Sequence, residues 1–71
     1  MPTVKYLVPN ISCHHCVMTI ERELRALDGV LDVYAEVPGK TVEVTFDAPA
    51  TEEQIRQRLA EIHYPAAQRL N

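Results

Sequence analysis

The sequence predicts an α+β fold, the ferredoxin-like βαββαβ sandwich, with two helices on one face of a four-stranded antiparallel sheet. Apolar residues alternate in short segments and follow helical spacing in two others. The segments succeed one another as strand, helix, strand, strand, helix, strand, and two β-α-β halves in this order form the split sandwich. With 71 residues the chain is long enough for one small domain, spanning residues 1–71.

The first half begins with a strand over residues 4–8, where alternating apolar residues stop at Pro9 and Asn10. From about Cys16 the apolar spacing becomes helical, and Asp28-Gly29 marks the helix end because glycine suits the left-handed position after the last turn. The apolar stripe of this helix is Val17, Ile20, Leu24 and Leu27. We expect Met18 to pack beside that stripe. The charged residues are expected to form a solvated, self-paired face: Glu21, Arg22, Glu23 and Arg25.

The second half begins with a hairpin, formed by strands over residues 30–37 and 42–46 around a Pro38-Gly39-Lys40 turn. Thr51 and Gln54 match a capping box, which predicts the start of the second helix. The buried stripe of that helix is Ile55, Leu59 and Ile62. His63-Tyr64-Pro65 ends it, and residues 66–70 supply a short last strand. The face of the sheet opposite the helices should meet water, which suits Lys5, Asp32, Glu36, Glu43 and Thr45.

Composition excludes several classes of function. A chain this short has a thin core, which argues against an enzyme with a deep, enclosed pocket. The formal net charge is −3 and the basic residues are not clustered, which argues against nucleic acid as a partner. Apolar runs are too short for membrane insertion. The N-terminus lacks the apolar segment of a signal peptide, so we expect a cytoplasmic protein.

The side chains best suited to bind a metal ion are concentrated in the segment C-H-H-C at residues 13–16, between the first strand and the first helix. Cys13 and Cys16 are three residues apart, so a helical turn brings both sulfurs to one side. The helix start favours thiolate over thiol at Cys16, because unpaired N–H groups and the positive dipole end lie there. Thiolates select soft ions, and two sulfurs suffice for a near-linear Cu(I) site, whereas a structural zinc site requires four ligands.

The three histidines are not equivalent. His14 and His15 lie inside the tight C-x-x-C loop, where intervening side chains tend to point away from the converging sulfurs, so we expect solvated loop residues rather than ligands. The alternative is that one of them, more plausibly His15, tunes the local charge or reaches a metal ion in a dimer. His63 is distant in sequence, but the pseudo-symmetry of the fold brings the loop after the second helix beside the cysteine loop. His63 is therefore a candidate third ligand or a hydrogen-bond partner of the thiolate, and the alternative is a polar helix-end residue. Tyr64 either covers the site or ends the helix as a core aromatic.

Three segments together resemble the heavy-metal-associated (HMA) domain, and in particular a small bacterial copper chaperone: V-P-N-I-S-C-H-H-C-V at residues 8–17, L-R-A-L-D-G-V at 24–30, and E-I-H-Y-P-A at 61–66. The resemblance covers nearly the whole chain. Ser12, rather than an acidic residue, precedes the first cysteine and looks more like the copper branch than the zinc branch. Ile11 replaces the usual methionine and can keep its apolar anchor, and His63 stands where bacterial members often have glycine.

The resemblance implies that Cys13 and Cys16 bind Cu(I) as a bis-thiolate and pass it by ligand exchange to the metal-binding domain of a copper-transporting P-type ATPase. A metal-bridged homodimer is a second possible assembly. Two alternatives stay open from the sequence: a Zn(II)- or Hg(II)-binding relative of the same fold, and a dithiol redox protein, since C-x-x-C also begins a helix in thioredoxin-like sites. Nothing in the sequence assembles the residues of a catalytic site.

Overall fold

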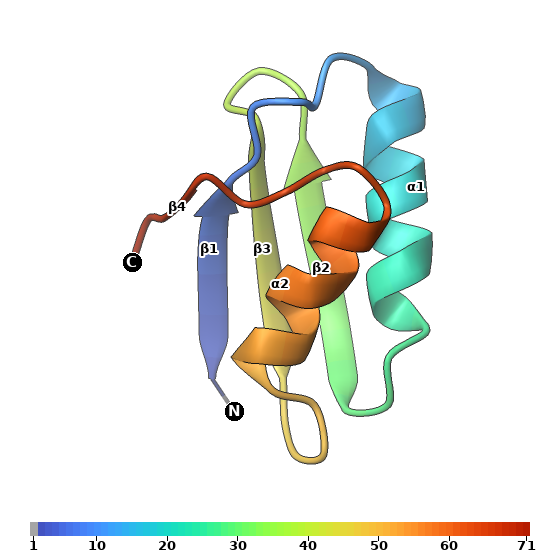
Figure 1. The fold of residues 1–71 in the computed structure, drawn as a ribbon, viewed down its shortest axis with the longest axis vertical. Helices are drawn as coiled ribbons and strands as arrows, with labels where there is room; N and C mark the ends of the chain where they lie inside the picture. Colours follow the sequence, from blue (N-terminus) through green and yellow to red (C-terminus); the bar gives the residue numbers. More distant parts are fainter. Residues whose placement is uncertain (1) are drawn as a thin grey trace.

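A computed structural model describes residues 2–71 and confirms the predicted order of strands and helices. Three strands form most of the sheet, β1 (Thr3–Leu7), β2 (Val30–Glu36) and β3 (Thr41–Phe46), and β4 (Gln68–Arg69) is a short fourth strand. Helices α1 (His14–Arg25) and α2 (Glu52–Glu61) pack on one face (Figure 1). The sheet order is β2-β3-β1-β4, and every neighbouring pair is antiparallel.

Register follows from the alternation of apolar side chains. Val4 pairs with Val44 and Tyr6 with Val42, which places all four side chains on the face covered by the helices. In the β2–β3 hairpin, Val33 also faces Val44 across the strands. A one-residue slip would turn every one of these side chains to water, so burial fixes the register.

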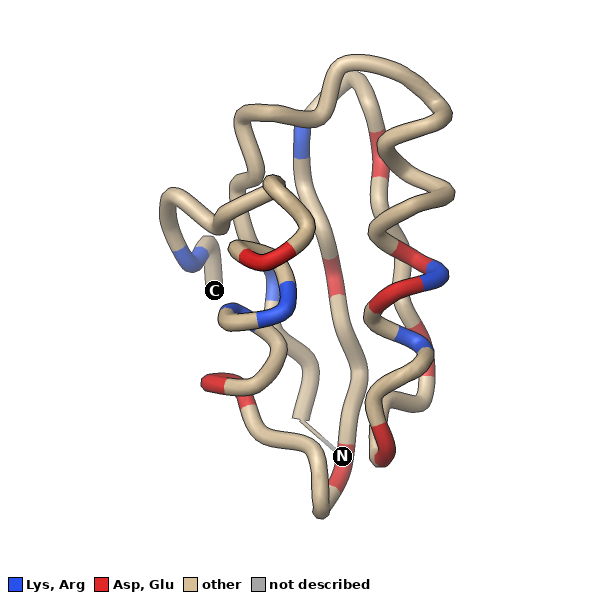
Figure 2. Tube along the Cα trace, turned by 45° about the vertical axis from the view of Figure 1, so that its right-hand side comes forward, with Lys and Arg blue, Asp and Glu red and all other residues tan. Residues whose placement is uncertain are grey.

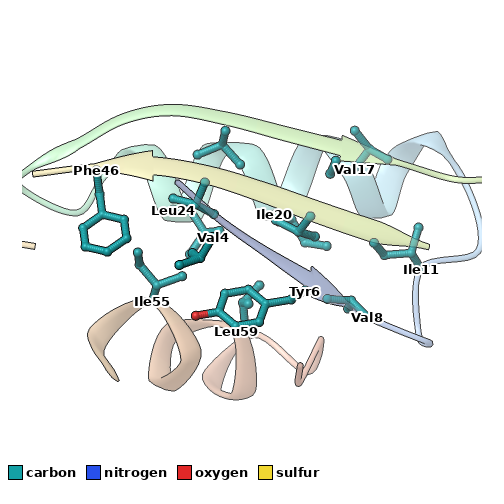
Figure 3. Packing of buried hydrophobic residues seen from close by; sticks show 14 of the residues in the cluster. Val4, Tyr6, Val8, Ile11, Val17, Ile20, Leu24, Phe46, Ile55 and Leu59 are labelled. Atoms are coloured by element: carbon teal, nitrogen blue, oxygen red, sulfur yellow. The ribbon is translucent and has the colours of Figure 1, made fainter. Parts of the chain in front are cut away.

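The core lies between the sheet and the two helices (Figure 3). α1 contributes Val17, Ile20 and Leu24 of its predicted stripe. α2 contributes Ile55 and Leu59, both fully buried, whereas Ile62 of its predicted stripe lies just past the helix and is partly buried. The buried apolar set is Val4, Tyr6, Val8, Ile11, Cys16, Val17, Ile20, Leu24, Val33, Ala35, Val42, Val44, Phe46, Ala50, Ile55 and Leu59. Cys16 is part of this set, so the core extends directly to the candidate site.

The two helices start differently. Thr51 caps α2 through the predicted box: its side chain accepts a hydrogen bond from the Gln54 N–H, and the Gln54 side chain accepts one from the Thr51 N–H. α1 begins two residues earlier than its apolar spacing indicates, because Cys13 is the N-cap and His14 and His15 already have helical conformation. These two histidines are not part of the apolar stripe, so periodicity could not place them in the helix.

Other boundaries also differ from the predictions. α1 ends at Arg25, so Leu27 packs partly buried beyond the helix rather than on its last turn. The predicted last strand is shorter, because only Gln68 and Arg69 have strand geometry, although the N–H groups of Ala67 and Leu70 still donate to β1 carbonyls. Within residues 2–71, neither helix is long and apolar enough to cross a bilayer.

Two side-chain predictions on α1 are wrong. Met18 does not pack beside the core, since its side chain is 57% exposed. The charged face is not purely self-paired. Arg22 pairs with Glu23, but Glu21 accepts a hydrogen bond from the backbone of β2 and Arg25 donates one to it. Both residues extend from α1 toward the edge of the sheet, a contact that helical spacing cannot reveal.

Candidate metal centre

The cysteine loop lies at one end of the molecule, where the β1–α1 connection and the β2–β3 turn meet (Figure 1). Ile11 anchors this loop: its side chain is fully buried and joins the core cluster, and its N–H donates to the Val8 carbonyl at 3.1 Å (Figure 3). The predicted apolar anchor is therefore confirmed. Because Ile11 is fixed two residues before Cys13, the backbone enters the helix at a defined point.

Cys13 and Cys16 are brought together as the spacing predicts. Their sulfur atoms are 3.8 Å apart, and both thiols are free. Cys13 is the extended N-cap residue, with φ −158° and ψ 171°, and its carbonyl accepts the first helical hydrogen bonds from the N–H groups of Cys16 and Val17. The Cys13 side chain is exposed and that of Cys16 is buried. One sulfur is thus accessible from solvent while the other is fixed against the core.

The pKa of the Cys16 thiol falls from an ordinary 9.0 to about 6. The Tyr64 hydroxyl is the largest cause, because it donates to the thiolate, and the backbone N–H of Ser12 adds to the effect. Burial opposes ionisation, and smaller donations from the Cys13 backbone and the Ser12 hydroxyl, 3.7 Å from the sulfur, favour it. The thiolate in turn raises the pKa of Tyr64. Cys16 is therefore mainly thiolate at neutral pH, the form that binds soft metals.

Tyr64 both packs against the core and reaches the site, but it lies beyond the end of α2. Its ring packs partly buried against the core, and its hydroxyl reaches Cys16. The loop that carries it lies beside the cysteine loop, as pseudo-symmetry predicts, and the Asn10 side-chain amide donates to the His63 carbonyl at 3.1 Å. This hydrogen bond joins two loops that are 53 residues apart. The sequence offered no signal for Asn10, because an asparagine after proline is usual in any turn.

His63 occupies a special backbone position. Its φ is +71°, in the left-handed region, and it follows the last turn of α2. The Tyr64 N–H donates to the Leu59 carbonyl at 2.9 Å and the His63 N–H to the Ala60 carbonyl at 3.1 Å. This pair of hydrogen bonds is the Schellman motif, in which glycine usually takes the left-handed place. His63 thus ends the helix, and its predicted part in metal binding stays a prediction.

His14 and His15 are exposed in the first turn of α1. Within residues 2–71, no three side chains of histidine, cysteine, aspartate or glutamate are grouped closely enough to share an ion. The geometry therefore assembles a pair of sulfurs, supported by Tyr64 and Ser12. Two soft donors, one of them already ionised, suit a soft monovalent ion better than a hard divalent one.

Comparison with known proteins agrees with this arrangement. The family model for the heavy-metal-associated domain matches residues 5–65, which include both cysteines and Tyr64. The chain belongs to the heavy-metal-associated domain family. Among its relatives is a COP-associated protein of Helicobacter pylori strain J99, 43% identical over 56 residues that cover 79% of this chain and 85% of the relative.

Two further proteins are similar to this HMA domain. The copper chaperone CopZ of Bacillus subtilis is 42% identical over 41 residues, which cover 58% of this chain and 59% of CopZ. The solution structure of the Atx1–Cu(I)–Ccc2a complex contains a chain that superposes with a TM-score of 0.85 at 26% identity, covering 97% of this chain and 94% of that one. The fold and the recognition of a small bacterial copper-chaperone-like HMA domain are therefore confirmed.

Proposed function

We propose that this HMA domain is a cytoplasmic Cu(I) carrier that holds the ion between Cys13 and Cys16. The observation that carries the proposal is the thiol pair itself: two sulfurs 3.8 Å apart at a helix start, with the pKa of Cys16 near 6. The names of its relatives, a COP-associated protein and a copper chaperone, support copper as the cargo. The carrier performs no reaction of its own and is not an enzyme.

Binding begins at Cys16, whose thiolate is present before the ion arrives. Cys13 then supplies the second sulfur and releases its proton to solvent, so that two thiolates hold the ion in a site of net charge −1. Ser12 and Tyr64 donate hydrogen bonds to Cys16, which disperse its negative charge and weaken its hold on the ion. Moderate retention suits a carrier, because an ion held by fully basic thiolates would leave slowly.

The recipient we propose is the metal-binding domain of a copper-transporting P-type ATPase. Transfer proceeds by thiolate exchange: a recipient thiolate bonds to the ion beside Cys13, and the bond to one donor thiolate breaks, so the ion passes through three-sulfur coordination. Cys13 is exposed, so an incoming sulfur reaches the ion from that side. The superposition with a chain of the Atx1–Cu(I)–Ccc2a complex supports a partner of similar fold.

The face around the cysteines carries little charge. Residues 6–20 and 62–68 contain no lysine, arginine, aspartate or glutamate. Lys40 of the adjoining β2–β3 turn brings one positive charge to this end, where its side chain donates to the Pro9 carbonyl at 3.3 Å, and Figure 2 shows most other charged positions along the helices and strands further away. Met18 is exposed on α1 within this uncharged stretch. We infer that docking depends on apolar contact, so the rate of transfer should vary little with ionic strength.

A competition titration tests the proposal. Reduced wild-type protein is titrated with Cu(I) against a Cu(I) chelator, beside Cys13→Ser, Cys16→Ser and His63→Ala, with Zn(II) and Hg(II) in parallel. We expect tight Cu(I) binding that either cysteine substitution abolishes. Preference for Zn(II) or Hg(II) would assign the chain to the alternative branch, and feeble Cu(I) binding with strong dithiol reductase activity would contradict the carrier.

The same set of proteins tests the proposed role of His63 as third ligand or hydrogen-bond partner. X-ray absorption of the copper-loaded protein should show a nitrogen neighbour if His63 is a ligand, and the affinity or transfer rate of His63→Ala should change. If only sulfur neighbours were found and affinity and transfer rate were unchanged, His63 would have no role in metal binding and would serve only to end α2. A metal-bridged homodimer would appear as a copper-dependent doubling of mass.

A further inference from the structure

One side of the sheet ends in a long strand. In the order β2-β3-β1-β4, β2 has a neighbour only on one side, and its seven residues make it the longest strand of the four. An edge strand of this length offers unpaired N–H and C=O groups to a strand of another molecule. Leu31 and Tyr34 on β2 are 53% and 59% exposed, which makes the edge apolar as well as open.

The outward-facing backbone groups of β2 belong to alternate residues. Val33 and Ala35 lie opposite Val44 and Val42 in the β2–β3 ladder. In an antiparallel pair, residues of one parity bond to the neighbouring strand and those of the other parity point away from it. The Val33 carbonyl and the Ala35 N–H both form hydrogen bonds with side chains of α1. These two backbone groups therefore point away from β3, toward the open edge of the sheet.

Two side chains of α1 occupy these groups. The Glu21 carboxylate accepts from the Ala35 N–H at 3.2 Å, and the Arg25 guanidinium donates to the Val33 carbonyl at 3.1 Å. Glu21 and Arg25 are four residues apart and therefore on one side of the helix, which runs alongside β2 (Figure 1). Arg25 also forms an exposed ion pair of 3.4 Å with Asp32 of β2.

The chemistry of the two side chains matches the groups that they cover. A carboxylate only accepts hydrogen bonds, and a guanidinium only donates them. Glu21 therefore occupies an edge N–H and Arg25 an edge carbonyl, the two kinds of group with which an incoming strand would pair. The strand also has a register irregularity between Val30 and Asp32, a feature that further disfavours regular pairing at an edge. An incoming strand would have to displace both charged groups and leave them without these partners.

We propose that Glu21 and Arg25 form an edge cap that prevents a second copy of the chain from pairing with β2. The occupant that the cap excludes is the antiparallel β2 of another molecule, because the same edge can meet itself across a two-fold axis with Val33 and Ala35 near the centre. The inference is independent of metal binding, since the cap residues do not contact the cysteines. It assigns a role to charged residues that would otherwise appear as a solvated helix face.

The test compares oligomeric state in four reduced, metal-free proteins over a wide concentration range. The wild type should stay at the monomer mass of 8.0 kDa. Glu21→Ala with Arg25→Ala should double that mass as concentration rises. Glu21→Gln with Arg25→Lys keeps an acceptor and a donor and should remain monomeric. Glu53→Ala with Arg56→Ala removes the same two residue types from exposed positions on α2 and should also remain monomeric.

A second comparison distinguishes edge pairing from general association. Ala35→Pro removes the outward N–H, at an edge position where proline is tolerated, and should restore the monomer in the Glu21→Ala, Arg25→Ala background. Amide chemical shifts of that background should change with concentration only along β2. If the double variant does not fold, single Glu21→Ala and Arg25→Ala variants take its place. A folded variant that lacks the cap and stays monomeric at every concentration, or association that Ala35→Pro does not reverse, would overturn the proposal.

Discussion

Cys13 and Cys16 have the same covalent chemistry and different surroundings. Cys13 precedes the helix and is exposed, and its sulfur lies 3.8 Å from that of Cys16. Cys16 lies one turn further on, buried beneath Tyr64 and beside Ser12, and its thiol is the one whose pKa is lowered. The pair therefore combines a buried thiolate with an exposed thiol, which is the arrangement that the proposed carrier function requires.

Replacing Tyr64 with phenylalanine should raise the pKa of Cys16. The Tyr64 hydroxyl is the largest cause of the lowering, so its removal moves the pKa from about 6 toward the ordinary 9.0. The thiolate absorbance of Cys13→Ser, measured against pH with and without Tyr64→Phe, gives the pKa of Cys16 alone. Tyr34→Phe changes an exposed tyrosine on β2 and should have no effect. An unchanged pKa in Tyr64→Phe would contradict the assignment.

Residue spacing predicted part of this site. The three-residue separation of the cysteines was enough to bring the sulfurs together, because helical geometry at that point is local. The left-handed conformation of His63 and the hydrogen bond from Asn10 to its carbonyl could not be predicted, because both depend on where two distant loops meet. The prediction that Met18 packs in the core was wrong for a different reason. Its position next to the apolar stripe did not show whether that side of the helix faces the core or solvent, and it faces solvent.

The end of α2 carries backbone strain that a single substitution should relieve. His63 has φ +71°, which costs a residue with a Cβ more than it costs glycine. His63→Gly should therefore raise the free energy of unfolding by roughly 0.5–1 kcal/mol. Urea unfolding of the apoprotein measures this, with His63→Ala as the matched control that keeps the Cβ and should not stabilise. Destabilisation by glycine would mean that the imidazole itself supports the fold.

The start of α2 depends on its capping box. Thr51→Ala removes the side-chain oxygen that accepts from the Gln54 N–H, and should lower the free energy of unfolding by about 1 kcal/mol. Thr51→Ser keeps the oxygen and should come close to the wild type. Denaturant unfolding of the three proteins tests this, and equal stability of Thr51→Ala and Thr51→Ser would show that the cap contributes little.

At the scale of elements, prediction succeeded where one pattern decides the structure. The capping box and the alternating hairpin strands are such patterns, and both were found as predicted. The last strand was also predicted, but only Gln68–Arg69 of residues 66–70 form it, because this segment has no clear alternation and is ordered by pairing with β1. There the Asn71 side chain continues the ladder, accepting from the Lys5 N–H and donating to the Thr3 carbonyl. Such a side-chain substitute for backbone pairing is invisible in the sequence.

For the whole molecule, the ionisation of Cys16 links stability to pH. The folded-state pKa is about 6 and lies below the unfolded value near 9, so between these two values the unfolded chain binds more protons than the folded one. The contribution of Cys16 is therefore complete above about pH 9 and is lost as pH falls through about 6. Urea unfolding of the reduced apoprotein across this range should show stability rising with pH. Cys16→Ser should flatten that rise, and an equal rise in both proteins would assign it to other groups.

Copper loading should stabilise the whole fold, because the two sulfurs are gathered only when α1 and its preceding loop are formed. An ion that binds the folded chain and not the unfolded one adds about 4.1 kcal/mol at a free concentration 1,000-fold above its dissociation constant. Thermal unfolding of the reduced protein with increasing buffered Cu(I) should therefore show a rising midpoint. Cys13→Ser with Cys16→Ser is the control and should show no rise. The unfolded chain keeps its C-x-x-C and retains some affinity, which reduces the effect. A midpoint that does not move at saturating Cu(I) would mean that the folded arrangement of the sulfurs gives the ion no advantage over the unfolded chain.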